Sequence, residues 1–403
     1  MTVCTSYIHI LGMGSSAPST GIVDAYTHYA PLALAKYLQE DCNDGMPLVF
    51  AKLFERIPLL TDVSARLAFM DTHKIDVHVL VPLPWLEVVP ACHTNKERAL
   101  EACKRANNEM AAVVQSHSTR FLGVALLPTG HLKGPGKEDE EEGASHEKDG
   151  MDILMEAYKH AVETCSLDGV ALFVGPLSSP LDHPGFEALW KRCEEDGVPV
   201  WLHPNRPQFY PDYEAYRGKG GSLHQIWNTL GWVYDTSVAM VHMVMAGVFQ
   251  RYPNLKVVTH HHGGMIPFFT DRFITQSQNF DDTEGLALLD DMKKFYCDTA
   301  TFGLAPLNIR QALEFFESGR VLFGTDTPMD MAEPGSFTST SKGGVLQCGA
   351  AQDVMDKIWG QNFWVMMEKR LELKKAHNME VKGNVDTIDH TREKARVSDS
   401  STS

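Results

Sequence analysis

The chain has 403 residues, of which 43% are hydrophobic and 22% charged, a balance typical of a soluble globular protein that can bury a large core. Its formal net charge of −16 argues against general binding to nucleic acid and means that an anionic substrate needs locally placed Arg or Lys. No apolar run reaches the roughly 20 residues that span a bilayer, and residues 1–20 do not resemble a signal peptide, so we expect a cytoplasmic protein that contacts no membrane.

Eight short apolar runs bounded by turn residues recur along the chain, and we predict that each is a strand. Most are nearly continuous in apolar and β-branched residues, as in parallel strands that are buried on both faces. In chain order they are Gly21–Tyr26, Ile75–Val81, Phe121–Leu127, Gly169–Val174, Val198–His203, Leu255–His260, Phe295–Thr299 and Arg320–Thr325.

Segments with apolar residues three and four apart lie between these runs and are predicted to be helices. Strand and helix alternating in this way predict an α/β fold of the (β/α)₈ TIM-barrel type, with an open doubly wound sheet as the alternative. The helical segments are Glu97–Ser118, Asp152–Thr164, Gly185–Glu195, Ser237–Phe249 and Pro306–Phe316.

Several segments fall outside the alternation, and we expect the barrel itself to span residues 21–375. Residues 1–20 form an N-terminal extension, and residues 376–403 a charged tail that frays. Residues 130–150 contain five consecutive acidic residues and are expected to be a solvated, disordered surface insertion. Residues 205–235 form a long connection rich in Tyr, Gly and Trp, of the kind that covers the active site of a barrel.

The eight cysteines form no CxxC pair, and several fall inside helix-like or strand-like runs. This pattern is typical of reduced, buried thiols in an intracellular protein. The cysteines are Cys4, Cys42, Cys92, Cys103, Cys165, Cys193, Cys297 and Cys348.

Polar residues stand at the carboxyl ends of four predicted strands, where barrel enzymes place their catalytic groups. They are His28 after strand one, His203 on strand five, His260-His261-His262 on strand six, and Asp326 after strand eight. Imidazole and carboxylate groups suit Zn²⁺ or a similar divalent ion. A single His after a strand is more often a hydrogen-bonded loop residue than a ligand, and Asp326 could instead cap a turn. The prediction of a metal centre therefore depends on finding potential ligands at four strand ends together.

Six short motifs occur in a defined order along the chain. They are Met70–Asp76, Arg120–Gly123 with Leu127-Pro128, Gly247–Phe249 with Tyr252-Pro253, Thr259–Gly264 with Pro267, Leu322–Asp326 with Pro328, and Gly360–Asn362. In this order and spacing they resemble the second amidohydrolase family of metal-dependent barrels, the aminocarboxymuconate-semialdehyde decarboxylase-like group. The resemblance runs from about residue 21 to about residue 372.

The resemblance implies that His28, His203 and Asp326 bind one divalent metal ion, Zn²⁺ or alternatively Mn²⁺. The family usually has His-x-His or Glu-x-His on strand one, but the first position here is Tyr26. A neutral phenol, with a pKa near 10, is a poor ligand. We therefore expect Tyr26 to pack in the barrel mouth and donate a hydrogen bond, with a metal-bound phenolate or a metal-free barrel as the alternatives.

The resemblance also implies that one histidine of strand six lies near the reacting atoms. The family pattern has six residues from this His to a Pro, and Pro267 fits His261. His260 and His262 would then point elsewhere. The predicted catalytic residues are therefore His261 and Asp326.

Two arginines are candidates for holding a small-molecule carboxylate substrate. Arg272 lies five residues after Pro267 and matches an Arg that contacts the substrate in the resembling decarboxylases, sometimes from a neighbouring subunit, which would imply a homodimer. Arg66 is the weaker candidate for the same role. Arg suits bidentate recognition of carboxylates, but a surface salt bridge is the alternative for both.

We predict non-oxidative decarboxylation of an unsaturated or aromatic carboxylic acid, with the metal as Lewis acid. His261 would take or donate a proton, and Asp326 would relay a proton to the carbon that loses CO₂. One alternative is metal-dependent hydrolysis of an ester, lactone or amide, which uses the same ligands. Another is a metal-free, non-catalytic barrel, against which four converging polar groups argue.

Overall fold

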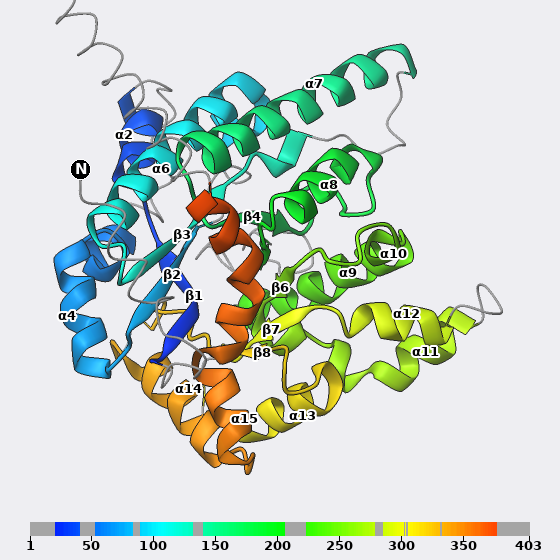
Figure 1. Cartoon of the computed structure of the whole chain (residues 1–403). Helices are drawn as coiled ribbons and strands as arrows, with labels where there is room; N and C mark the ends of the chain where they lie inside the picture. The colour runs from blue at the N-terminus through cyan, green and yellow to red at the C-terminus, as the bar shows by residue number, and fades with distance from the viewer. Residues whose placement is uncertain are drawn as a thin grey trace, which may run out of the picture.

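The computed structural model describes residues 21–40, 53–83, 89–131, 140–205, 223–278, 285–301, 303, 305–330 and 333–376. In these ranges a ring of helices surrounds a central set of strands (Figure 1). No helix in the described part of the chain is long and apolar enough to cross a membrane.

Eight parallel strands form one sheet in which each strand pairs with the next along the chain. Every residue of these strands is buried, which explains their nearly continuous apolar sequences. They are β1 (Val23–Tyr29), β2 (Val77–Pro82), β3 (Phe121–Leu126), β4 (Gly169–Val174), β5 (Val200–Pro204), β6 (Val257–Thr259), β7 (Tyr296–Asp298) and β8 (Val321–Leu322).

The sheet closes because the segment that follows β8 pairs with β1. The Asp326 amide donates to the Tyr26 carbonyl at 2.9 Å, and the His28 amide donates to the Thr327 carbonyl at 2.7 Å. Closure confirms the predicted (β/α)₈ barrel and excludes the open doubly wound sheet.

The helices cover the outside of the barrel (Figure 1). They are α2 (Leu32–Glu40), α4 (Val63–His73), α5 (Pro90–Thr94), α6 (Lys96–Ser116), α7 (Glu140–Lys159), α8 (Glu187–Glu195), α9 (Trp232–Met245), α10 (Val248–Arg251), α11 (Thr270–Gln278), α12 (Gly285–Met292), α13 (Pro306–Phe316), α14 (Ser336–Gln347) and α15 (Gln352–Asp356). Side-chain caps fix where some of them begin: Asp62 accepts hydrogen bonds from the amides of Ser64 and Ala65 at the start of α4.

The predicted strands are all present with small shifts at their ends, but the predicted helix Ser237–Phe249 is divided into α9 and α10 at Gly247, and the helix predicted from Asp152 begins at Glu140. Helix α13 has the predicted bounds, whereas β1 begins two residues and ends three residues later than predicted. Residues 140–150 belong to α7, so the expected disorder of the acidic insertion is wrong for them. Their Glu, Ala and Lys residues favour helix, and acidic residues suit its first turn. Residues 132–139, like 1–20, 206–222 and 377–403, lie outside the described residues.

The cysteines agree with the expectation of reduced thiols. Those in the described part of the chain are all buried and free of disulfides: Cys92, Cys103, Cys165, Cys193, Cys297 and Cys348. Cys4 and Cys42 lie outside the described residues. No described cysteine therefore cross-links the fold through a disulfide bond, and packing and hydrogen bonds stabilise the barrel.

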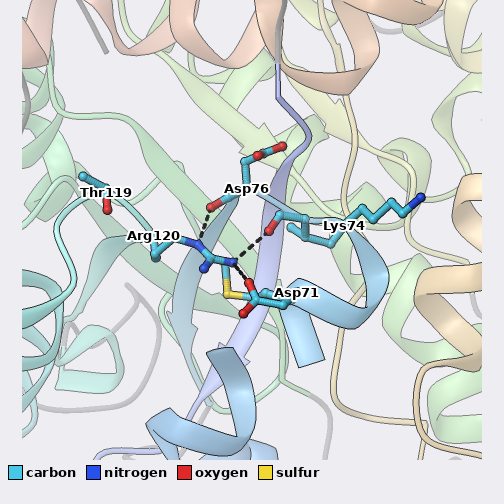
Figure 2. A pocket seen from close by; sticks show the side chains of 7 residues that line it. Asp71, Lys74, Asp76, Thr119 and Arg120 are labelled. Atoms are coloured by element: carbon cyan, nitrogen blue, oxygen red, sulfur yellow. Dashed lines mark hydrogen bonds and ion pairs between the residues drawn. The ribbon is translucent and has the colours of Figure 1, made fainter. Parts of the chain in front are cut away.

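A polar hollow lies at the amino-terminal ends of β2 and β3 (Figure 2). Within it the Arg120 guanidinium bonds the Asp71 carboxylate at 2.8 Å and the carbonyls of Asp76 and Ile75 at 3.0 and 3.2 Å. These contacts fasten the end of α4 to the strand entrances. Because barrel enzymes place their chemistry at the opposite face, we assign this hollow a structural role.

One tryptophan links β5 to β1 through the barrel interior. Trp201 is fully buried, and its indole Nε1 donates to the Ala25 carbonyl at 3.0 Å. Gly169 on β4 leaves space for the indole, since a Cβ at this position would lie 2.2 Å from the Trp201 ring. This contact fixes β5 two residues before His203.

Gly169→Ala should destabilise the fold by about 1–3 kcal/mol, because the added methyl group forces Trp201 or its strand to move. The measurement is the free energy of unfolding in denaturant. Gly319→Ala is the matched control, because no atom lies within 4 Å of the place that its Cβ would take. Equal stability of the two variants would show that the barrel interior is looser than described.

Candidate metal centre

Three imidazoles and one carboxylate meet at the carboxyl ends of the strands. His28 comes from β1 and His203 from β5, while His260 directly follows β6 and Asp326 follows β8. All four side chains are at most 4% exposed. The ligand atoms of the three histidines lie within 4.8 Å of one another, and Asp326 Oδ1 lies 2.9 Å from His28 Nε2.

Each of the three imidazoles has its Nδ1 engaged by the protein and its Nε2 turned to the centre. Nδ1 of His28 lies 3.3 Å from the Val81 carbonyl, and Nδ1 of His203 lies 2.6 Å from the carbonyl of the next residue. Nδ1 of His260 pairs with the Asp298 carboxylate. An Nδ1–H donor in this position leaves the Nε2 lone pair for a metal ion, the usual arrangement in metal sites.

The spacing of these donor atoms fits a divalent ion. Two ligand atoms at metal-binding distance from one ion lie roughly 3.0–3.4 Å apart in octahedral or tetrahedral coordination. His28 Nε2 lies 3.2 Å from His203 Nε2, and Asp326 Oδ1 lies 2.9 Å from His28 Nε2 and 3.5 Å from His260 Nε2. Two buried Nε2 lone pairs that face each other need a cation or a proton between them.

The electrostatics of the centre keep His203 and Asp326 in the forms that bind metal. Burial, together with the neighbouring His28 and His260, lowers the pKa of His203 well below its ordinary value, so this imidazole is neutral. Burial alone would raise the pKa of Asp326, but the neighbouring imidazoles of His260 and His28 outweigh it and hold that pKa well below the usual range. A neutral imidazole and an ionised carboxylate are both metal ligands.

His261 also lies at this centre. Its Nε2 lies 4.0 Å from Asp326 Oδ2, and burial lowers its pKa well below the ordinary value. His261 and Asp326 both adopt left-handed backbone conformations, with φ of 54° and 63°. Such strained conformations of non-glycine residues concentrate at functional sites. His261 and Asp326 are thus brought together as expected, and their catalytic roles stay a prediction.

The expectation that His260 points elsewhere is wrong, because its Nε2 faces the centre. In the sequence, the motif spacing singles out His261 among three consecutive histidines. In the structure, the left-handed backbone at His261 allows the rings of both His260 and His261 to lie at the centre. A signal for His260 was present in the sequence. Asp298 ends the neighbouring strand β7, where a carboxylate can orient a histidine.

Tyr26 packs beside the centre, and its hydroxyl is engaged in a hydrogen bond within the protein. Its hydroxyl donates to the Leu202 carbonyl at 2.8 Å, and its ring stacks on the His260 ring with centroids 3.8 Å apart. Burial, and then the charges of Asp298 and Asp326, raise the pKa of Tyr26 well above its ordinary value. The neutral phenol is favoured, which confirms the interpretation of Tyr26 as a packing residue that donates a hydrogen bond.

Arg66 does not fit the predicted substrate-binding role. It is fully buried, and its guanidinium donates to the His28 carbonyl, to the Leu59 carbonyl at 2.7 Å and to the Thr27 hydroxyl at 3.3 Å. These contacts occupy its donors within the protein. Arg66 therefore supports the backbone of β1 at His28, a role that sequence spacing alone does not reveal.

Asp24 joins β1 to the segment that carries Asp326. Its carboxylate accepts from the Thr325 hydroxyl at 2.6 Å and from the Thr325 amide at 3.1 Å. Burial raises the pKa of Asp24 to about 7, although these hydrogen bonds lower it. The contact fixes the chain one residue before Asp326.

Arg272, the other predicted substrate-binding residue, lies on α11 and is exposed in the single chain. An exposed guanidinium is available to a neighbouring molecule. Contact between Arg272 and a substrate stays a prediction. The homodimer that such a contact with a neighbouring subunit's site would require also stays a prediction.

The family model described as Amidohydrolase matches residues 23–362. Among curated proteins, the chain is 25% identical to a gamma-resorcylate decarboxylase of Rhodococcus jostii over 73% of this chain and 86% of that protein. It is 24% identical to a 2-amino-3-carboxymuconate-6-semialdehyde decarboxylase of Dictyostelium discoideum, over 70% and 71%. It is 28% identical to a 6-methylsalicylic acid decarboxylase of Penicillium expansum, where the match covers 43% of this chain and only about half, 53%, of that protein.

Solved structures share the fold at low sequence identity. A 2,6-dihydroxybenzoate decarboxylase from Rhizobium matches with a TM-score of 0.66 and 21% identity over 87% of this chain and 99% of that one. A dihydroxybenzoic acid decarboxylase from Polaromonas sp., with bound manganese and the inhibitor 2-nitroresorcinol, matches with a TM-score of 0.65 and 20% identity over 87% and 97%. These matches agree with the barrel described above.

Tyr26→Phe should keep the metal content of the wild type while lowering stability by about 1–2 kcal/mol, because the Leu202 carbonyl loses its partner. Elemental analysis and denaturant unfolding measure the two effects. A folded Tyr26→Phe protein that has lost its metal would instead identify the phenolate as a ligand.

Asp24→Asn should gain stability relative to wild type as the pH rises from about 4 to about 7. The folded protein holds the Asp24 proton up to about pH 7, whereas the unfolded chain releases it near 3.8. Wild-type stability therefore falls across this window by about 3 kcal/mol, and the uncharged Asn avoids that loss. Unfolding of the metal-free proteins at several pH values measures it.

Asp353→Asn, on the exposed part of α15, is the matched control for the loss of one carboxylate. A pH profile of Asp24→Asn that runs parallel to that of the wild type would contradict the raised pKa of Asp24.

Proposed function

Because the chain belongs to the amidohydrolase family, we propose that it is a divalent-metal-dependent, non-oxidative decarboxylase of an aromatic or unsaturated carboxylic acid. The observation that carries this proposal is the buried cluster of imidazole Nε2 atoms around the Asp326 carboxylate at the barrel mouth. The names of the curated relatives support a carboxy-lyase, since each of the three described above is called a decarboxylase. Hydrolysis of an ester, lactone or amide is the outcome that the assays below must exclude.

One divalent ion is proposed for the cluster, held by His28, His203 and Asp326. Nitrogen and carboxylate donors suit Zn²⁺, which is our first choice, and Mn²⁺ is supported by the manganese named for the Polaromonas structure. The ion supplies Lewis acidity that polarises a substrate oxygen and stabilises negative charge on the carbon skeleton.

The chain's own residues then move the proton that decarboxylation requires. The bond between the carboxylate and its carbon breaks, CO₂ leaves, and the electron pair that stays on the carbon accepts a proton. We propose that a water molecule supplies this proton and that His261 Nε2 and Asp326 Oδ2, which lie 4.0 Å apart, relay it to the carbon. Their burial excludes bulk water, which would otherwise screen the charges.

The substrate carboxylate needs a cationic partner because the chain as a whole is strongly acidic. The guanidinium of Arg66 already donates to the carbonyls of His28 and Leu59, so Arg272 is our candidate for this partner. Because Arg272 is exposed in the single chain, we propose that it acts on the site of a second copy in a homodimer. A bidentate guanidinium contact would orient the carboxylate for cleavage.

Purified wild-type protein should contain about one divalent ion per chain, and His203→Ala should lose it, because His203 presents a neutral Nε2 to the cluster. Elemental analysis measures both. His242→Ala, which removes a partly exposed histidine paired with Asp182, is the control that keeps the metal. Wild-type protein that stays metal-free after incubation with Zn²⁺ or Mn²⁺ would contradict the proposed function.

The metal-loaded protein should release CO₂ from members of a panel of hydroxybenzoic acids and release no acid from esters, lactones or amides of similar size. His261→Asn, whose side chain tolerates the left-handed backbone at this position, should lower kcat by about 10²–10⁴-fold with unchanged metal content. Acid release without CO₂ would favour the hydrolase, and full activity of His261→Asn would remove His261 from the mechanism.

A further inference from the structure

We propose that His260 is a fourth ligand of the metal centre, alongside His28, His203 and Asp326. The inference rests on the proposed function for the presence of a metal ion at this place. It goes further by assigning the ion a ligand set of three imidazoles and one carboxylate, in which the segment after β6 contributes a ligand through the first of its three histidines.

The position of the His260 side chain is the first argument. Its ring is fully buried, and its ligand atom lies within 4.8 Å of those of both His28 and His203. Its Nε2 is 3.5 Å from Asp326 Oδ1 and makes no hydrogen bond to any described residue. A buried ring nitrogen without a hydrogen-bond partner, aimed at three other donors, is costly unless a cation fills the space between them.

The orientation of the ring is fixed from two sides. Asp298 pairs with Nδ1, and this carboxylate is itself held by the amides of His261 and Ala300 at 3.1 and 3.0 Å. The Tyr26 ring stacks on the imidazole at an interplanar angle of 11°. A carboxylate on the far nitrogen of a histidine is the arrangement that orients metal ligands and strengthens their basicity.

The neighbouring histidines are placed differently. Two groups of three potential ligands can be drawn from the described residues: His28, His203 and His260, and then His260, His261 and Asp326. His260 is common to both groups, whereas His261 does not join the group that contains His28 and His203. Because His260 alone belongs to both groups, we assign it to the metal and leave His261 for proton transfer.

X-ray absorption of the Zn²⁺-loaded wild type tests the assignment by counting imidazoles. We expect three, and we expect three again in His261→Gln. Two imidazoles in the wild type, or a fall from three to two in His261→Gln, would overturn the assignment. These measurements need no substitution at His260, so they decide the question even if that variant fails to fold.

Variants at the three adjacent histidines supply the second test. His260→Gln should raise the dissociation constant for Zn²⁺, measured by competition with a chelator, by at least about 100-fold. His262→Gln is the matched control, because His262 is equally buried but belongs to neither ligand group. Equal affinity of folded His260→Gln and His262→Gln would overturn the assignment.

The proposed function and the role of His260 can fail separately. Absence of metal from the loaded wild type would remove the proposed function together with this inference. Metal that is bound through two imidazoles would leave the proposed function in place and remove only the role of His260.

Discussion

The pairing of β1 with the segment after β8 is the contact on which the rest of the centre depends. His28 and Asp326 come from opposite ends of the chain, and their side chains meet at 2.9 Å because the backbone bonds between Asp326 and Tyr26 and between His28 and Thr327 close the barrel. Closure therefore assembles the chemistry as well as the fold. A barrel that opened at this seam would lose both its sheet and its charge arrangement.

Buried polar groups around this seam fix the positions of the strand ends that carry His28 and Asp326. Arg66 holds the His28 carbonyl from outside β1, and Asp24 holds Thr325 next to Asp326. Each is a charged or titratable group removed from water, which is costly unless hydrogen bonds compensate. An apolar side chain at either position would avoid this desolvation cost, but it would not fix the position of the strand end through hydrogen bonds.

Much of the molecule could be predicted from sequence, because its signals are local. Apolar runs located the strands, and polar residues at strand ends located His28, His203 and Asp326. The roles of His260 and Arg66 could not be predicted in the same way. The direction of the His260 ring depends on Asp298 and on Tyr26, and the burial of Arg66 depends on Leu59 and β1, so both are set by tertiary contacts.

The contact between Gly169 and Trp201 constrains how this chain can diverge. The indole occupies the space that any side chain at position 169 would need, so the two positions cannot change independently. A smaller residue must first replace Trp201 before Gly169 can gain a side chain, and that intermediate loses the bond to Ala25. Mutational paths through this part of the barrel are therefore ordered, with epistasis between neighbouring strands as the expected signature.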